Sequence, residues 1–181
     1  GNLMFDSGAE VTGLCHMMIM ITFISVFAYD YLYRSGLIKD VRVMTAVTFV
    51  LIAGIIYLMK FYGQFSYRAF NIHLGALFGT NMAFNVWFRI WPAQQSIITA
   101  IKNSEAPDSD LVALAGLRSK HNTYMSVPLI WTMMNQHTTV FAGGNFGITD
   151  STNWLVLLII IALGWHIVWQ LYKKSGTVKG F

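Results

Sequence analysis

Long apolar stretches separated by short polar segments dominate the pattern of this chain. A helix that crosses a bilayer needs about 20 mostly apolar residues. Segments of that kind predict five transmembrane helices, at residues 11–33, 43–62, 71–91, 123–141 and 154–172. The fourth is the most polar, because Asn135, Gln136 and His137 lie near its end. We therefore expect an all-α integral membrane bundle of five transmembrane helices, folded as a single transmembrane domain over residues 1–181.

The composition supports a membrane protein and excludes several other classes. Of the 181 residues, 55% are hydrophobic and 11% are charged, whereas a soluble domain carries about 25% charged residues. So few charges cannot cover a soluble surface. A single cysteine, Cys15, excludes an intrachain disulfide framework and a covalent CxxCH haem attachment.

The basic residues predict the orientation of the helices. Residues 34–42, 89–120 and 173–179 hold most of the 12 basic residues, and cytoplasmic segments of membrane proteins are rich in lysine and arginine. We expect the N-terminus outside, the C-terminus inside, and residues 92–122 as a cytoplasmic loop. This distribution explains the net charge of +4 without a nucleic-acid partner, and the lipid bilayer is the expected environment.

The cytoplasmic loop at residues 92–122 contains local helical signals. Residues 94–101 carry isoleucines at a spacing that predicts a short amphipathic turn on the inner membrane surface. Pro107 then interrupts the pattern, and Asp110 is placed to cap a second short helix that runs to Arg118.

Three of the five histidines, His16, His73 and His137, fall at about the same predicted depth near the outer face. Ionisable side chains inside a bilayer are costly, and imidazole is a common ligand of haem iron. His73 and His137 best fit the two axial ligands of a haem b, because they lie on predicted helices that follow one another. His16 is a third candidate ligand or a hydrogen-bonding group. The alternative is an interfacial histidine bonded to a backbone carbonyl or a lipid headgroup.

His121 lies at the inner end of the fourth predicted helix, 16 residues before His137. That separation is about 24 Å along an ideal helix, so the two cannot bind one metal. His121 is thus a candidate ligand for a second, inner site together with His166. The alternative is a solvated residue at the loop edge, because His121 follows Arg118 and Lys120.

The third predicted helix has two distinct faces. Asn81 and Asn85 lie on a polar face, and Gly75 and Gly79 form a small-residue motif typical of close helix packing. Buried amides need hydrogen-bond partners. Asn81 and Asn85 are therefore interpreted either as contacts between helices or as the lining of a substrate or quinone pocket.

Other catalytic chemistry has little support in the sequence. The chain shows no nucleotide-binding loop, zincin motif, catalytic triad or pair of intramembrane carboxylates. Asp30 is the one acidic residue expected within a span, at its inner edge, and a surface ion pair with Arg34 at i+4 accounts for it.

Several motifs resemble one family in their order and spacing. They are the run from His73 to Trp87, Ile90 to Gln94, Pro107-Asp108, Arg118 to Tyr124, Val127 to Leu129, Asn135 to His137, and Asn153 to Leu155. Together they cover roughly residues 29–176 and resemble the membrane domain of bacterial membrane-bound, cytochrome-c-linked urate oxidases.

The resemblance implies a place for this chain in a larger assembly. Members of that family look like eight-helix proteins followed by a haem-c domain, and this chain resembles their C-terminal five-helix part. His73, His121 and His137 match family positions, whereas His16 and His166 do not. The implied location is the bacterial cytoplasmic (inner) membrane, and the implied partners are other membrane subunits and a cytochrome c or haem-c subunit.

Three functional hypotheses follow. The first is a membrane subunit of a respiratory-type electron-transfer complex that binds haem b near the outer face and relays electrons to or from quinone or cytochrome c. The second is a cofactor-free structural subunit of a multisubunit complex. The third is part of a urate-oxidase-like enzyme that becomes catalytic together with other chains.

Overall fold

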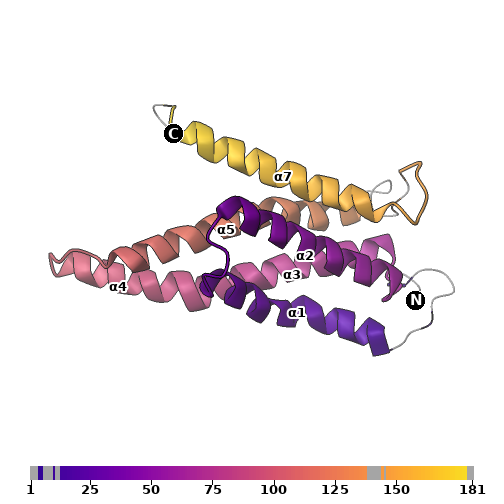
Figure 1. Ribbon diagram of the computed structural model, residues 1–181, viewed down its shortest axis with the longest axis horizontal. Helices are drawn as coiled ribbons and strands as arrows, with labels where there is room; N and C mark the ends of the chain where they lie inside the picture. Colours follow the sequence, from indigo (N-terminus) through magenta and orange to yellow (C-terminus); the bar gives the residue numbers. More distant parts are fainter. Residues whose placement is uncertain (1–3, 6–9, 11–12, 138–143, 145, 179–181) are drawn as a thin grey trace.

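The computed structural model describes residues 4–5, 10, 13–137, 144 and 146–178, and the fold of these residues is all-α, as predicted (Figure 1). The helices lie side by side as a bundle, with α1 at one edge and α7 at the other. The elements are α1 (Gly13–Arg34), α2 (Val41–Phe61), α3 (Tyr67–Asn85), the π-helical turn η1 (Val86–Ile90), α4 (Trp91–Lys102), α5 (Ser109–Met134), the 3₁₀ turn η2 (Asn135–His137) and α7 (Trp154–Ser175).

Three helices, α1, α2 and α7, are long and apolar enough to cross a membrane, so the chain is a multi-pass membrane protein. They coincide with the first, second and fifth predicted spans. Most of their apolar side chains point away from the bundle, as Phe27, Val50 and Ile159 do. Outward-facing apolar side chains at this density are suited to contact with lipid.

The third and fourth predicted spans fall on α3 and α5, which within the described residues do not reach the apolarity of α1, α2 and α7. Their position explains the difference. α3 packs against α1, α2 and α5, and about half of its side chains are buried inside the protein. A helix shielded by its neighbours keeps polar residues that lipid would not tolerate. The five-span topology and the outside N-terminus stay predictions.

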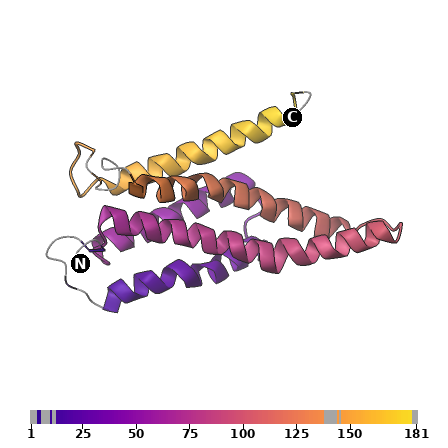
Figure 2. The same cartoon turned by 180° about the vertical axis from the view of Figure 1, so that it is seen from behind.

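The segment at residues 92–122 contains the two expected helical stretches, and these belong to longer helices that form a hairpin. α3 continues through η1 into α4, and α5 returns from residue 109 alongside it, beyond the ends of the other helices (Figure 2). The π turn ends just before Pro92, which lies at the start of α4 and has no backbone N–H to donate. The cap of α5 also differs, since Asp108 rather than Asp110 accepts the backbone N–H groups at its start.

α3 and α5 are in close antiparallel contact. Asn71 meets Asn135 near one end of this contact, and Asn85 meets Asn122 near the other. Between them Gly75 faces Thr132 so closely that an added Cβ would collide with the threonine hydroxyl. Of the two glycines in the predicted packing motif, only Gly75 is tightly packed, because nothing lies within 4 Å of a Cβ placed at Gly79.

This contact predicts opposite effects for two similar substitutions. Gly75→Ala should destabilise the bundle by about 1–3 kcal/mol, because α3 and α5 must move apart. Gly79→Ala, the matched control, should leave stability unchanged or raise it by about 0.5–1 kcal/mol, since alanine favours helix. Thermal unfolding of both variants in detergent measures the difference, and equal stability would show that the contact tolerates a methyl group.

Candidate functional site

A charged core forms where α1, η1 and α5 meet, and it consists of Asp30, Arg89 and Arg118. Arg89 reaches Asp30 with two donors: its Nε lies 2.9 Å from Oδ1, and its Nη2 contacts Oδ2. Arg118 Nη2 donates to the same Oδ1 at 2.9 Å. Two guanidinium groups therefore share one carboxylate.

The expected ion pair between Asp30 and Arg34 is present, but Arg34 is not the main partner of the Asp30 carboxylate. The two side chains are 3.7 Å apart, but Arg34 is 62% exposed while Asp30 is only 10% exposed. The partners that matter are Arg89, at 22% exposed, and Arg118, at 1%. Removing one member of a buried ion pair costs about 3–5 kcal/mol, because the other charge stays buried without compensation.

Two aromatic rings cover the guanidinium of Arg118. Its Cζ lies 5.2 Å from the ring centre of Tyr29 and 5.9 Å from that of Tyr33. Tyr33 is itself fixed by a hydrogen bond of 2.9 Å between its hydroxyl and that of Thr48. A cation over such rings is stabilised by their negative faces.

A neutral hydrogen-bond network adjoins the charged core. Asn85 Nδ2 donates to the Tyr29 hydroxyl at 2.9 Å and to Asn122 Oδ1 at 2.8 Å. The Tyr29 hydroxyl lies 2.8 Å from His121 Nδ1. Because Asn85 already donates to Tyr29, the phenol is placed to donate in turn to an unprotonated Nδ1.

His121 is thus a half-buried member of this network rather than a solvated loop-edge residue. Burial, followed by the positive charges of Arg118 and Lys120, lowers the pKa of His121 from 6.5 to about 4. The imidazole is therefore neutral near pH 7. His166, its suggested partner at an inner site, is exposed on α7 beside Gln170.

The other three candidate histidines lie at the opposite end of the bundle. His16 is exposed in the first turns of α1, next to Cys15, whose thiol contacts the Gly63 carbonyl before α3 begins. His73 is half-buried on α3, and His137 is exposed at the end of η2. The hydrogen bond between Asn71 and Asn135 places the last two at a similar level.

His73 has the hydrogen bonding of a possible metal ligand, and it lies on a face of α3 other than the one that packs against α5. His73 Nδ1 donates to the Ala69 carbonyl at 2.7 Å, which leaves Nε2 as the nitrogen that could face a metal, and the Phe65 ring lies 4.8 Å from the imidazole. Gly75, two residues later, faces α5. Two residues rotate a helix by about 200°, so His73 lies on a different face of α3. No cluster of three or more His, Cys, Asp or Glu side chains suited to a metal occurs in the described part of the chain.

The predicted polar face of α3 is buried. Asn81 is 5% exposed and Asn85 is fully buried. Asn85 joins α3 to α1 and α5 through its amide nitrogen, whereas Oδ1 of each asparagine meets no hydrogen-bond donor among the described residues. Contact between helices therefore accounts for the N–H donors of the Asn85 amide but not for its C=O acceptor.

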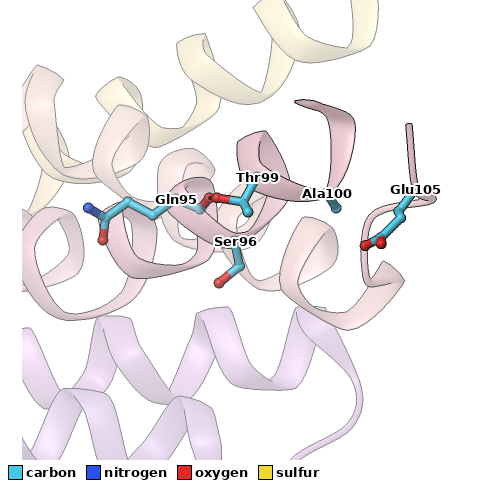
Figure 3. A pocket seen from close by; sticks show the side chains of 5 residues that line it. All are labelled: Gln95, Ser96, Thr99, Ala100 and Glu105. Atoms are coloured by element: carbon cyan, nitrogen blue, oxygen red, sulfur yellow. Dashed lines mark hydrogen bonds between the residues drawn. The ribbon is translucent and has the colours of Figure 1, made fainter. Parts of the chain in front are cut away.

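A shallow surface pocket on α4 contains none of these residues (Figure 3). It is wide open, and the side chains around it are mostly exposed. Its lining consists of Gln95, Ser96, Thr99, Ala100 and Glu105.

The sequence alone did not predict Arg89, Arg118 or Tyr29 as members of the site. One signal was available: Arg118, His121 and Asn122 recur at i, i+3 and i+4, which places them on one face of α5. A second was the carboxylate of Asp30 inside an apolar span, since one exposed arginine cannot neutralise a buried charge.

Comparison with known families identifies the chain. Residues 6–179 match the family described as urate oxidase N-terminal. The chain belongs to the urate oxidase N-terminal family. This confirms the family that the motifs resemble, and it favours the third functional hypothesis, part of a urate-oxidase-like enzyme, over a haem b electron-transfer subunit. Neither the search of curated proteins nor that of solved structures found a match.

The environment of His121 predicts acid sensitivity in this urate oxidase N-terminal domain. The folded chain takes up a proton at His121 only near pH 4, whereas an unfolded chain does so near pH 6.5. The contribution of the neutral His121 to the free energy of unfolding is therefore fully present above about pH 6.5. Up to about 3 kcal/mol of it is lost as the pH drops to 4. His121→Gln keeps an acceptor for Tyr29 and does not titrate.

Unfolding of wild type and His121→Gln, measured from pH 7.5 to 4, tests this prediction. The wild type should lose more stability than the variant, and the gap should widen below pH 6.5. Parallel pH profiles would show that the neutral state of His121 is not linked to folding.

Proposed function

We propose that the chain is the membrane-embedded part of a urate-oxidase-type oxidoreductase, which oxidises urate together with other chains. The observation that carries this proposal is the match to the urate oxidase N-terminal family across residues 6–179. Urate gives up electrons when it is oxidised, so the assembly needs an acceptor. A cytochrome c or haem-c subunit at the outer face of a bacterial inner membrane is the proposed acceptor.

The buried polar groups support an active role over a purely structural one. A helical anchor gains nothing from a fully buried arginine, because charge inside a membrane protein is costly. Here Arg118 and Asp30 lie in the interior together with a network of Tyr29, Asn85 and His121. With the N-terminus outside, this region lies toward the cytoplasm.

Urate-dependent reduction of cytochrome c by membranes that contain the intact assembly tests the proposal. Addition of urate should reduce cytochrome c, whereas membranes lacking this chain should not respond. Absence of urate-dependent reduction in membranes in which all subunits are assembled would overturn the proposed function.

A second candidate function is haem b binding near the outer face with electron transfer to quinone or cytochrome c. It is supported by His73, whose Nδ1 donates to a backbone carbonyl as metal-bound histidines commonly do. A haem b there would accept and pass single electrons. The second axial ligand would be His137, as the sequence predicts, or His16.

A reduced-minus-oxidised absorbance spectrum of the complex, purified in mild detergent, tests the second candidate. A haem b band that disappears in His73→Ala and persists in His166→Ala, an exposed histidine on α7, would support it. A wild-type spectrum without a haem b band would rule this candidate out and leave the urate-oxidase proposal intact.

A further inference from the structure

Arg118 is almost fully buried, but its observed hydrogen bonds use only part of its N–H donors. Its residue exposure is 1%, and Nη2 donates to Asp30. Nε and Nη1 are also buried, yet neither meets an acceptor within the described part of the chain. Buried donors in folded proteins are nearly always paired. The unpaired N–H groups therefore point to an acceptor that the described residues do not provide.

The charge balance points the same way. Asp30 is the carboxylate that both Arg89 and Arg118 contact, so the charged core carries a net positive charge. An unmatched buried cation is strongly destabilised in a low-dielectric interior. An anion next to Arg118 would remove the imbalance.

The neighbours of Arg118 restrict what this anion can be. Tyr29 connects Arg118 to Asn85, because its ring lies under the guanidinium and its hydroxyl accepts from the amide. Asn85 Nδ2 is used twice, which fixes the amide, and Oδ1 stays without a donor. Tyr29 thus lies between the unpaired N–H donors of Arg118 and the residue that carries the unpaired C=O acceptor, Asn85.

We infer that Arg118 and Asn85, beside the rings of Tyr29 and Tyr33, bind a planar heterocyclic anion of the urate class. Urate is flat, is an anion near neutral pH, and presents both C=O and N–H groups at its edges. Its carbonyl or anionic edge would accept from Arg118, and an N–H would donate to Asn85 Oδ1. This inference rests on the proposed function and names the residues that would recognise its substrate.

Arg89 and Asp30 hold Arg118 from the side nearest to solvent. Arg89 is the more exposed of the two arginines at 22%, and it holds the carboxylate against Arg118. Asp30 thus occupies Nη2 of Arg118 and leaves Nε and Nη1 for the ligand. Entry from the side of Arg89 would let the ligand reach Arg118 past the part of the charged core that lies nearest to solvent.

Direct binding without turnover tests the inference. Radiolabelled urate is equilibrated with the purified intact assembly, with oxygen and electron acceptor removed. Arg118→Gln should weaken urate binding about tenfold or more, the usual effect of losing a charge-assisted hydrogen bond. Arg118→Lys keeps the charge but lacks the planar guanidinium group. Its affinity for urate should therefore lie between those of the wild type and Arg118→Gln. The matched control is Arg42→Gln, an exposed arginine at the start of α2, which should bind as the wild type does.

A second measurement uses only the wild-type assembly, in case the Arg118 variants fail to assemble. Urate should raise the unfolding temperature, whereas hypoxanthine, a similar ring system without the charge at neutral pH, should have little effect. Equal stabilisation by both compounds would overturn recognition of an anion.

The outcomes separate this inference from the proposed function. Wild-type binding of urate with equal binding by Arg118→Gln would overturn the Arg118 site alone. Neither binding nor oxidation of urate by the wild type would overturn both. Wild-type binding that is lost in Arg118→Gln and kept in Arg42→Gln would support the inference.

Discussion

The cost of burying charge governs the arrangement of this bundle. Asp30 lies within an apolar helix, and Arg118 is almost fully enclosed by protein. Neither charge is stable there alone. Their pairing, reinforced by Arg89, brings α1, η1 and α5 to one point. The helices around this point have little freedom to shift without separating a buried charge from its partner.

This constraint also explains the helical hairpin formed by α4 and α5. Arg118 contacts Asp30 from α5, and Arg89 contacts it from η1, where α3 passes into α4. Both arms of the hairpin are thereby attached to α1 at their base. An interaction inside the bundle thus fixes a structure that extends beyond it, and a partner chain that contacts the hairpin would act directly on the charged core.

The two ends of the bundle differ in chemistry. One holds the charged core and the Tyr29–His121 network, and the other holds His16, His73 and His137 around an amide contact between α3 and α5. A urate-oxidase-type enzyme has to recognise a substrate and pass on its electrons. In our proposal recognition belongs to the end with Arg118, and the histidine-rich end faces the electron-accepting partner.

The sequence by itself determined the helical class, the long apolar helices α1, α2 and α7, and the family. The reason is that a bilayer imposes length and apolarity on any helix that faces it, and both can be read from residue order. The motif spacing from His73 to Asn153 likewise required no coordinates. Asn81 and Asn85 were expected to be buried because amides do not face lipid, and they are buried.

Only the tertiary structure decided which polar residues meet. Asp30 and Arg118 are 88 residues apart, and Tyr29 and His121 are 92 residues apart. Periodicity gives the face of a helix but not its neighbour, so the nearby Arg34 looked like a sufficient partner for Asp30. The same limit applies to Gly75, since only packing distinguishes it from Gly79 one turn later. Contacts between distant segments depend on how whole helices pack, and no local pattern encodes that arrangement.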